Sequence, residues 1–479
     1  MLFPTAAFAV FFSVVFLLNW LLRPFAVPWK LFMLGASYFF YGWWEVPFCL
    51  LLAGSTIANQ FFAEVIHRAR DERTARAWLV VAVVTDLAVL GWFKYYGFFV
   101  ESVTGALVKI GLHPNPPLLQ VVLPVGISFF TFHAVSYVID VYRHDIEPVA
   151  PLDFAVYMAF FPHLVAGPIV RASELVPQIR ARSDPRAVDS ALAFRLILVG
   201  LFKKVVISSY LATAVVDPVF AVPKAHSALE VLAAVYGYAI QIYADFSGYT
   251  DIAIGCALLL GFKFPQNFNR PYTARSVQDF WRRWHMTLSR FLRDYVYIPL
   301  GGNRGGPSRV RRNLMLTMLL GGLWHGAAWT FVIWGAIHGG AMVLERSRDD
   351  RRRAAGASAA GGSAIGAGSP LAAIGWWLVT FHVVCLGWVF FRAESLGAAF
   401  DMLGRLAAWG PAPLVTPLLV ATIVASVTVQ FVPFDAVKKL QTTFSELGPA
   451  WQGAVVAFGL VVVGALAPRG VAPFIYFRF

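Results

Sequence analysis

Residues 371–391 read LAAIGWWLVTFHVVCLGWVFF and contain no Asp, Glu, Lys or Arg. An α-helix needs about 20 mainly apolar residues to cross the hydrocarbon core of a bilayer, so this run predicts a membrane-spanning helix. Further runs of this kind lie at 2–22, 78–100, 118–140, 413–432 and 450–468. We interpret 2–22 as a retained first helix, because no basic segment and no small-residue cleavage site precede Asn19.

The composition extends this interpretation to the whole chain. Of the 479 residues, 58% are apolar and 14% are charged, whereas a soluble domain carries about 25% charged residues. The net charge is +13, but the basic residues lie in short loops between apolar runs, as in proteins that retain positive charge on the cytoplasmic side. Lipid is therefore an expected partner and nucleic acid is not. The three cysteines, Cys49, Cys256 and Cys385, lie in apolar runs without metal-ligand spacing.

The remaining segments predict more helices. Residues 31–66 should form two helices broken near Pro47, 190–216 and 228–263 should supply about three crossings, and 313–345 is too long for one simple crossing. We expect an all-α, polytopic helical bundle with about eleven transmembrane helices plus re-entrant and interfacial helices. Its single membrane domain divides into N-terminal helices (1–117), a catalytic core (118–345), a charged and then Ala/Gly/Ser-rich linker (346–370) and C-terminal helices (371–479).

The distribution of Lys and Arg predicts the orientation. The loop HRARDERTAR at 67–76 is strongly basic and should be cytoplasmic, which places residues 102–117 outside. The flexible linker AAGASAAGGSAIGAGS at 354–369 should also be cytoplasmic.

Histidines are the first candidates for chemistry, because ionisable groups at membrane depth are costly and the unperturbed histidine pKa lies near neutrality. His325 lies in GGLWHGAAW at 321–329. Three nearby glycines weaken a helix, and irregular backbone in a membrane is tolerated only inside protein or along a cavity. We therefore expect His325 to face an opening that a substrate can approach. The alternative is a helix-packing glycine motif beside a hydrogen-bonded histidine.

Two other histidines lie near this motif. His338 follows 13 residues later, and one straight helix cannot direct both rings to the same atom, so we expect His338 to be structural. His285 lies in QDFWRRWHMTLSRFLRDYVY at 278–297, whose aromatic and leucine residues fall on one helical face and whose arginines fall on the other. This pattern predicts an interfacial amphipathic helix with His285 at the edge of the apolar face. We expect His133, His163 and His382 to be core or interface histidines whose hydrogen bonds are satisfied.

Known soluble-enzyme motifs are absent from the sequence: there is no GxSxG, Walker loop, HExxH or GxGxxG in a βαβ setting. Several segments together resemble the membrane-bound O-acyltransferase family, and most closely its bacterial alginate O-acetyltransferase branch. They are LPVGISFFTFHAVSYVIDVYR (123–143), FFPHLVAGPIVR (160–171), QIYADFSGYTDIAIG (241–255), FPQNFNRPY (264–272), DFWRRWHMTLSRFLRDYVYIPLGGNR (279–304) and GLWHGAAWTFVIWGAIHG (322–339), with KYYGFF (94–99), VFFRAES (389–395) and FIYFRF (474–479).

The resemblance implies acyl transfer to a hydroxyl, with His325 as the invariant catalytic residue and His285 as the second active-site histidine. It suggests Trp324, Asn269 and Asp245 as substrate-binding residues. It implies no metal and no tightly bound cofactor, but acetyl-CoA or another acyl thioester as donor. The expected setting is the bacterial inner membrane, with a polysaccharide acceptor such as alginate and a periplasmic acetyl-accepting or polysaccharide-modifying protein as partner.

Other functions stay open at this point. The chain could be a D-alanyl or other acyl transferase of the same family that is fed by an acyl carrier protein. A polysaccharide flippase would also carry ionisable residues within the membrane, and a scaffold subunit would need no acyl chemistry at all.

Overall fold

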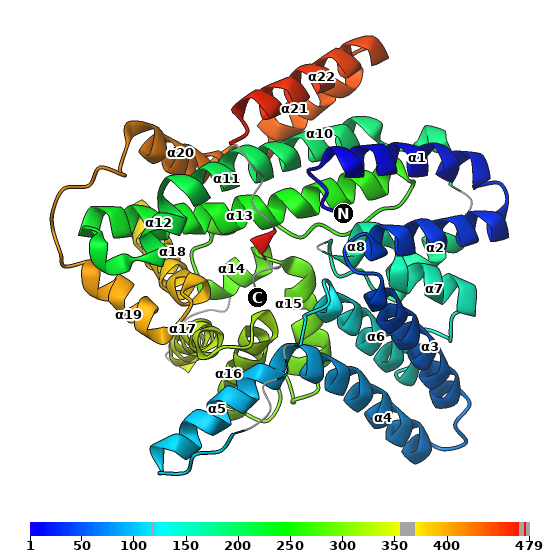
Figure 1. Ribbon diagram of the computed structural model, residues 1–479, viewed down its shortest axis with the longest axis horizontal. Helices are drawn as coiled ribbons and strands as arrows, with labels where there is room; N and C mark the ends of the chain where they lie inside the picture. Colours follow the sequence, from blue (N-terminus) through cyan, green and yellow to red (C-terminus); the bar gives the residue numbers. More distant parts are fainter. Residues whose placement is uncertain are drawn as a thin grey trace. The chain divides into compact units, whose positions relative to one another are not determined.

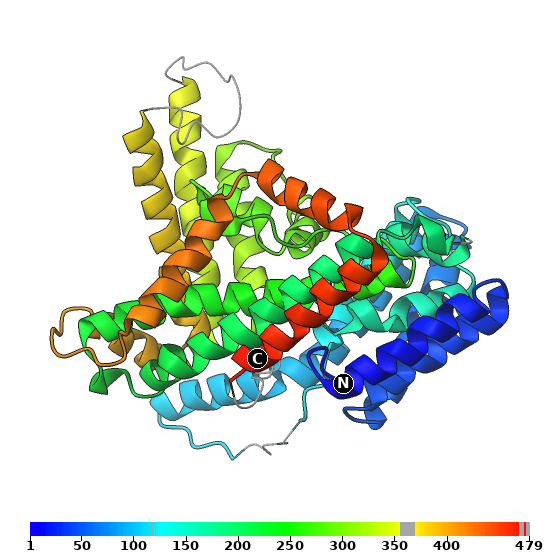
Figure 2. The ribbon, with the colours of Figure 1, turned by 90° about the horizontal axis from the view of Figure 1, so that it is seen from above.

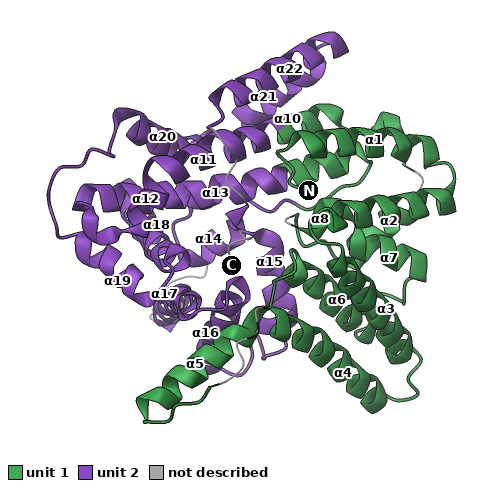
Figure 3. Cartoon of the chain, in the orientation of Figure 1, with its two compact units in different colours: residues 1–197, 252–265 green, residues 198–251, 266–479 purple. Residues whose placement is uncertain are grey.

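A computed structural model describes residues 1–115, 119, 121–165, 167–181, 183–354, 369–468 and 474–475. The regular structure within these residues is helical throughout, which confirms the all-α prediction (Figure 1). The chain divides into two compact units (Figure 3). Unit 1 comprises residues 1–197 and 252–265, and unit 2 comprises residues 198–251 and 266–479.

Unit 1 contains the N-terminal helices. They are α1 (Ala6–Leu22), α2 (Ala26–Gly42), α3 (Pro47–His67), α4 (Glu72–Leu90), α5 (Tyr96–Lys109), α6 (Ile127–Tyr142), α7 (Pro151–Ala159), α8 (Phe161–Leu164) and α9 (Ala172–Arg180). The predicted break at Pro47 is confirmed, because Pro47 is the first residue of α3. Asp71 caps α4, and the N–H and hydroxyl of Thr74 lower the pKa of its carboxyl group.

Two long helical stretches replace the three crossings expected from 190–216 and 228–263. The first contains α10 (Ser190–Leu201), α11 (Ser209–Leu211) and α12 (Asp217–Ala221), joined by two π-helical segments. The second is α13 (Ala228–Leu259), a single helix of 32 residues. Glycine allows α13 to pack closely against the first stretch, because a Cβ on Gly248 would lie only 2.7 Å from the carbonyl oxygen of Gly200.

The rest of unit 2 contains the segments with the candidate catalytic residues. Its helices are α14 (Val277–Arg283), α15 (Met286–Leu292), α16 (Pro307–His325), α17 (Trp329–Ala354), α18 (Pro370–Arg392), α19 (Leu396–Arg405), α20 (Pro417–Thr428), α21 (Phe434–Glu446) and α22 (Pro449–Leu466). Figure 2 shows α17 and α18 side by side, in yellow and gold. The Ala/Gly/Ser-rich part of the predicted linker, 354–369, lies almost wholly outside the described residues, whereas its charged part up to Ala354 continues helix α17.

Four helical segments among the described residues are long and apolar enough to cross a membrane: Pro47–His67, Glu72–Lys109, Pro370–Arg392 and Pro449–Leu466. A fifth exists if α20 and α21, which meet at 91°, count as one span. Helices α1 and α6 are apolar but shorter. Among its described residues, the predicted run at 118–140 becomes helical at Ile127, directly after Gly126, which adopts a left-handed conformation with φ of 78°.

Candidate active site

A tight hairpin of α16 and α17 fixes the position of His325. Helix α16 ends at His325, Gly326 is extended, and α17 begins at Trp329. The glycines permit the helices to approach closely: a Cβ on Gly322 would lie 2.3 Å from the carbonyl oxygen of Phe331, and one on Gly326 would overlap the Phe331 ring at 2.0 Å. These two glycines therefore allow close helix packing, while the catalytic role expected for His325 stays a prediction.

His325 is buried among aromatic rings, with only 2% of its surface exposed. Its ring centroid lies 5.0 Å from that of Trp324, 4.9 Å from that of Trp334 and 5.2 Å from that of Phe391. These rings form a hydrophobic wall beside His325, and the opening that a substrate could approach stays a prediction. A hydrophobic wall of this kind excludes water and strengthens any electrostatic interaction inside it.

His285 lies at a break in the predicted amphipathic helix. Helix α14 ends at Arg283 and α15 begins at Met286, while His285 itself is left-handed with φ of 41° and ψ of 56°. The prediction of one continuous helix over 278–297 is therefore wrong. The predicted apolar set is nevertheless buried: Phe280, Trp281, Trp284, Leu288, Phe291, Leu292 and Tyr295.

Asn267 stabilises the strained break. Its backbone oxygen accepts a hydrogen bond from the N–H of Met286 (2.9 Å), and its side-chain oxygen accepts bonds from the N–H and the hydroxyl of Thr287 (3.2 and 2.9 Å). A left-handed non-glycine residue persists only where surrounding contacts determine it. The segment FPQNFNRPY thus fixes the backbone of His285.

The ring of His285 is completely buried beside α13. The Phe246 ring meets it edge-on at 4.6 Å, and Trp324 lies 6.2 Å away between ring centroids. Neither ring nitrogen of His285 has a hydrogen-bond partner in the part of the chain that the structure describes. A buried imidazole without partners is costly unless a water molecule or substrate group completes it.

Trp324 lies against both candidate catalytic histidines, since its ring contacts His285 and His325. The structure therefore brings together three of the residues that the resemblance suggested, and they come from two separate segments of the chain.

Asp245 is buried on α13, but its oxygens already have partners within the protein. One carboxylate oxygen forms an ion pair with Lys204 and accepts a bond from the Ser208 hydroxyl at 3.3 Å. The other accepts a bond from the N–H of Ile475 at 2.8 Å. Next to Asp245, Phe246 contacts both His285 and Phe474. Asp245 thus holds residues 474–475 near the histidine site.

Asn269 is exposed, and its backbone N–H donates to the carbonyl oxygen of Arg283. The structure does not bring its side chain to the histidines. The buried amide in this segment is Asn267, which sequence reasoning missed. Its position two residues before Asn269 in FPQNFNRPY was visible, but nothing in the sequence distinguishes the buried asparagine from the exposed one.

His338 lies closer to His325 than one straight helix would allow, because the chain reverses between α16 and α17. Its centroid is 4.8 Å from that of Trp334, which in turn contacts His325. The Nδ1 atom of His338 accepts a hydrogen bond from the Trp281 indole at 3.3 Å. The straight-helix assumption is therefore wrong, while the structural role expected for His338 stays a prediction.

The histidines His133, His163 and His382 differ in whether their ring nitrogens have hydrogen-bond partners. His382 bonds the Tyr236 hydroxyl and the carbonyl oxygen of Leu378, each at 2.8 Å, so it is satisfied as predicted. His133 and His163 stack at 4.3 Å in unit 1, and His163 bonds the carbonyl oxygen of Tyr157 at 2.8 Å. Neither nitrogen of His133 has a partner within the described residues, which corrects the prediction for that residue.

Comparison with known proteins identifies the protein family to which the chain belongs. The family model of the membrane-bound O-acyltransferases matches residues 81–361, a range that contains both candidate catalytic histidines. The chain belongs to the membrane-bound O-acyltransferase family. It is a multi-pass membrane enzyme that transfers acyl groups to oxygen.

Comparison with individual proteins shows which members of the family the chain resembles. The chain is 45% identical to the probable alginate O-acetylase AlgI of Pseudomonas aeruginosa, over 80% of this chain and 70% of that protein. It is 40% identical to the AlgI protein of Pseudomonas putida over 94% of both chains. It is also 38% identical to the peptidoglycan O-acetyltransferase of Helicobacter pylori, over 78% of this chain and 73% of that one. These matches confirm the predicted family and its branch.

Proposed function

We propose that the chain acetylates an exopolysaccharide such as alginate, using a cytoplasmic acyl thioester as donor. The observation that supports this most directly is the contact of His285 and His325 with the same Trp324 ring in a buried cluster. Relatives named as alginate O-acetylases, matched over most of their length, support alginate as the acceptor.

In the proposed reaction, His325 acts as general base. It removes the proton from an acceptor hydroxyl as the oxygen attacks the thioester carbonyl. The tetrahedral intermediate collapses, the carbon–sulfur bond breaks, and the thiolate leaves with the proton that His325 returns. His285 stabilises the developing oxyanion, because a neutral imidazole has one N–H donor and this ring has no partner among the described residues.

The locations of the donor and the acceptor determine which sides of the membrane the active site must reach. Activated acetyl groups are made in the cytoplasm and the polysaccharide lies outside, so the site must be open to both sides of the inner membrane. We propose about eleven crossings plus re-entrant and interfacial segments, to which α14 and α15 belong. Because the acceptor is a polymer outside the membrane, a periplasmic polysaccharide-modifying protein is the expected partner.

Peptidoglycan is a second candidate acceptor, and one relative at 38% identity bears that activity in its name. Both acceptors present secondary or primary sugar hydroxyls, and the same base serves either. The choice between the two acceptors therefore depends on residues outside the buried histidine cluster.

The test is the O-acetyl content of envelope polysaccharides, measured by mass spectrometry in a deletion strain complemented with variants at matched protein level. His325→Ala should abolish acetylation, because loss of a general base removes about 10²–10⁴-fold in rate. His285→Ala should reduce it less completely. His338→Ala should act mainly on the amount of folded protein, since it accepts a structural hydrogen bond from Trp281. Full acetylation with His325→Ala would refute the assignment and favour a flippase or scaffold.

A further inference from the structure

The side-chain amide of Asn267 has an oxygen end and a nitrogen end, and only the oxygen has hydrogen-bond partners among the described residues. The oxygen accepts bonds from the N–H and the hydroxyl of Thr287 at 3.2 and 2.9 Å. Because a backbone N–H can only donate, the atom that it meets must be the amide oxygen. The nitrogen Nδ2 therefore lies at the other end of the amide, where no residue of the described chain bonds it. Asn267 is only 1% exposed, so bulk water does not reach it either.

Asn267 lies at the turn that carries His285. Its backbone oxygen accepts a hydrogen bond, at 2.9 Å, from the N–H of the residue that directly follows His285. The ring of the neighbouring Phe268 lies 5.0 Å from that of Trp284 and 5.1 Å from that of Phe246. Phe246 in turn meets the His285 ring at 4.6 Å. Asn267 and Phe268 therefore belong to the immediate surroundings of the second histidine.

The polar atoms without partners at this turn share one chemical need. Neither ring nitrogen of His285 is bonded within the described ranges, and a neutral imidazole offers one N–H donor. The amide nitrogen of Asn267 offers two more N–H donors. A buried donor without an acceptor is costly, as is the left-handed backbone of His285. Two such groups on one strained turn indicate that an acceptor oxygen binds there.

We propose that Nδ2 of Asn267 and the ring N–H of His285 together bind the carbonyl oxygen of the acyl group that is transferred. The inference rests on the proposed function and adds a substrate-contacting residue to the same site. When the acceptor hydroxyl attacks the acyl carbon and gives its proton to His325, the carbonyl oxygen becomes negative. The two donors hold this oxygen until the carbon–sulfur bond breaks, the carbonyl re-forms and the thiolate takes up the proton from His325.

The oxygen end of the amide explains how the nitrogen end is held ready. The terminal torsion of an asparagine side chain is soft, so an unbonded amide can rotate. Here rotation would break both bonds from Thr287, and the N–H groups of Asn267 therefore keep one direction. Donors that are fixed before the reaction stabilise a developing charge without reorganisation. The contact with Thr287 thus positions the amide, and the free end of the amide binds the substrate.

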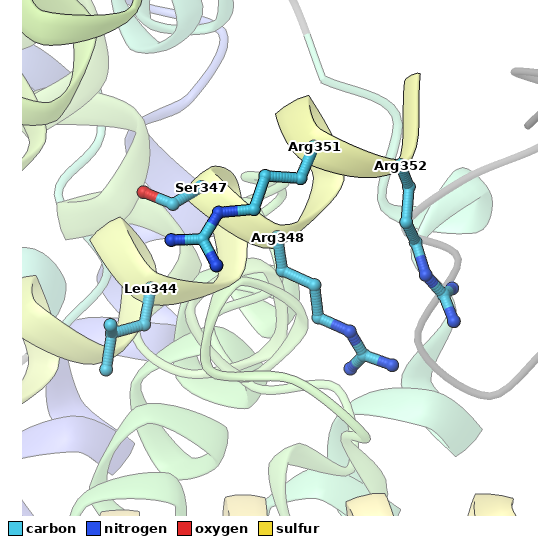
Figure 4. Close-up of a pocket in the computed structure, with 5 residues that line it drawn as sticks. All are labelled: Leu344, Ser347, Arg348, Arg351 and Arg352. Atoms are coloured by element: carbon cyan, nitrogen blue, oxygen red, sulfur yellow. The ribbon is translucent and has the colours of Figure 1, made fainter. Parts of the chain in front are cut away.

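Cationic side chains also stabilise negative oxygens, and Figure 4 shows arginines around a concave part of α17: Arg348, Arg351 and Arg352. These arginines lie on the last turns of the helix, whereas His325 precedes its first residue, Trp329. Arg348 follows Trp329 by 19 residues, which corresponds to about 28 Å along the helix axis. The neutral donors at the histidine turn are therefore better placed for the reacting oxygen than these arginines are.

Two substitutions separate the nitrogen of Asn267 from its oxygen. Asn267→Asp keeps an oxygen that accepts both bonds from Thr287 but replaces the N–H donors by a second acceptor. Thr287→Val keeps the amide and removes one of the two bonds that position it. The measurement is the initial rate of polysaccharide O-acetylation in the complemented deletion strain, at matched levels of folded full-length protein. Asn267→Asp should lower this rate about 10²–10³-fold, as loss of an oxyanion donor does. Thr287→Val should lower it by less than about tenfold, the value of one neutral hydrogen bond.

Two further variants control for charge. Asn269→Asp introduces the same charge at an exposed position of the same segment and should acetylate as the wild type does. Asn267→Ser also lacks the amide but is uncharged, and it should show a loss comparable to that of Asn267→Asp. It also serves as the test if Asn267→Asp does not accumulate. Thermal unfolding of the purified variants establishes that the rates compare folded proteins.

The order of the effects decides the role of the amide nitrogen. A wild-type rate in either Asn267 variant would overturn the inference. An equal loss in Thr287→Val and Asn267→Asp would overturn it too, because Asn267 would then act only by positioning His285. Both results leave the proposed function intact as long as His325→Ala abolishes acetylation. Full acetylation with His325→Ala would overturn the proposed function and this inference with it.

Discussion

Asn267 determines the backbone at the second histidine. Its side-chain oxygen is the acceptor for both the N–H and the hydroxyl of Thr287 at the start of α15. Without it, two buried donors lose their partner, which costs about 1–3 kcal/mol. Because His285 is left-handed at this point, the loss should also move its ring.

Asn267→Ala should therefore reduce acetylation strongly, while Asn269→Ala, a matched change at an exposed position of the same segment, should have little effect. The measurement is the O-acetyl content of the polymer at equal protein level. If Asn269→Ala were the more damaging change, the exposed amide would contact substrate, as the family resemblance first suggested, and the positioning role of Asn267 would be wrong.

The buried pair of Asp245 and Lys204 makes a second residue-level prediction. Their side chains are 3% and 1% exposed, and removal of one member of a buried pair costs about 3–5 kcal/mol because the other charge stays unpaired. Asp245→Asn and Lys204→Met should each lower the thermal stability of the solubilised protein. The double variant should be more stable than the sum of the single changes implies. Strictly additive losses would show that the two charges do not interact.

Chemical type directed attention to the histidines, because few side chains can act as a base at neutral pH, and the family resemblance then selected His285 and His325. The spatial relation between His285 and His325 was not predictable, since it depends on Trp324 and on two breaks in helices. The partners of Asp245 were equally hidden. Its contact with the backbone of Ile475 joins residues that are 230 positions apart, and no local pattern records such a contact.

At the scale of elements, the hairpin of α16 and α17 depends on glycine. Gly322 and Gly335 each face a carbonyl oxygen of the other helix, and a Cβ would lie 2.3 and 2.4 Å from that oxygen. No real contact is that short, so a larger residue must push the helices apart. His325 is the last residue of α16 and would move with it.

Gly322→Ala should destabilise the protein by about 1–3 kcal/mol through overpacking and should reduce turnover. Gly340→Ala is the control on α17, because its Cβ would have no atom within 4 Å. That change should be neutral or stabilising by up to about 1 kcal/mol, since alanine favours helix. Thermal unfolding of both purified variants checks the difference. Similar midpoints for the two variants would contradict the close-packing argument.

The predicted helix at 278–297 shows why an element can be misjudged while its buried face is correct. The apolar residues on both sides of His285 repeat at helical spacing, so the period continues through the break. The break itself is stabilised by Asn267, which is distant in sequence. A local pattern therefore identifies what is buried, but tertiary hydrogen bonds decide where the helix ends.

At the scale of the whole molecule, composition was sufficient to predict a membrane protein. Runs such as 371–391 and 450–468 correspond closely to α18 and α22, because unbroken apolar sequence has one stable arrangement in lipid, a helix. The helices in segments rich in glycine and aromatic residues were harder to predict. Residues 228–263 contain one long helix, and 313–345 contain a hairpin, because close packing between helices overrides simple hydropathy.

Orientation in the membrane provides the last prediction. The basic loop at 67–77 should be cytoplasmic and residues 102–117 should be external, because Lys and Arg are retained on the cytoplasmic side. The continuous helical segment Glu72–Lys109 connects these two regions and is long enough to cross the bilayer. Arg70 and Leu112 are exposed positions on either side of it.

In a variant without Cys49, Cys256 and Cys385, a cysteine introduced at Leu112 should react with an impermeant thiol reagent added to intact spheroplasts. A cysteine at Arg70 should react only after the membrane is opened. The same labelling should be done at position 360, in the linker that is predicted to be cytoplasmic. Reaction of position 360 from outside would contradict both the orientation and the proposed route of the donor.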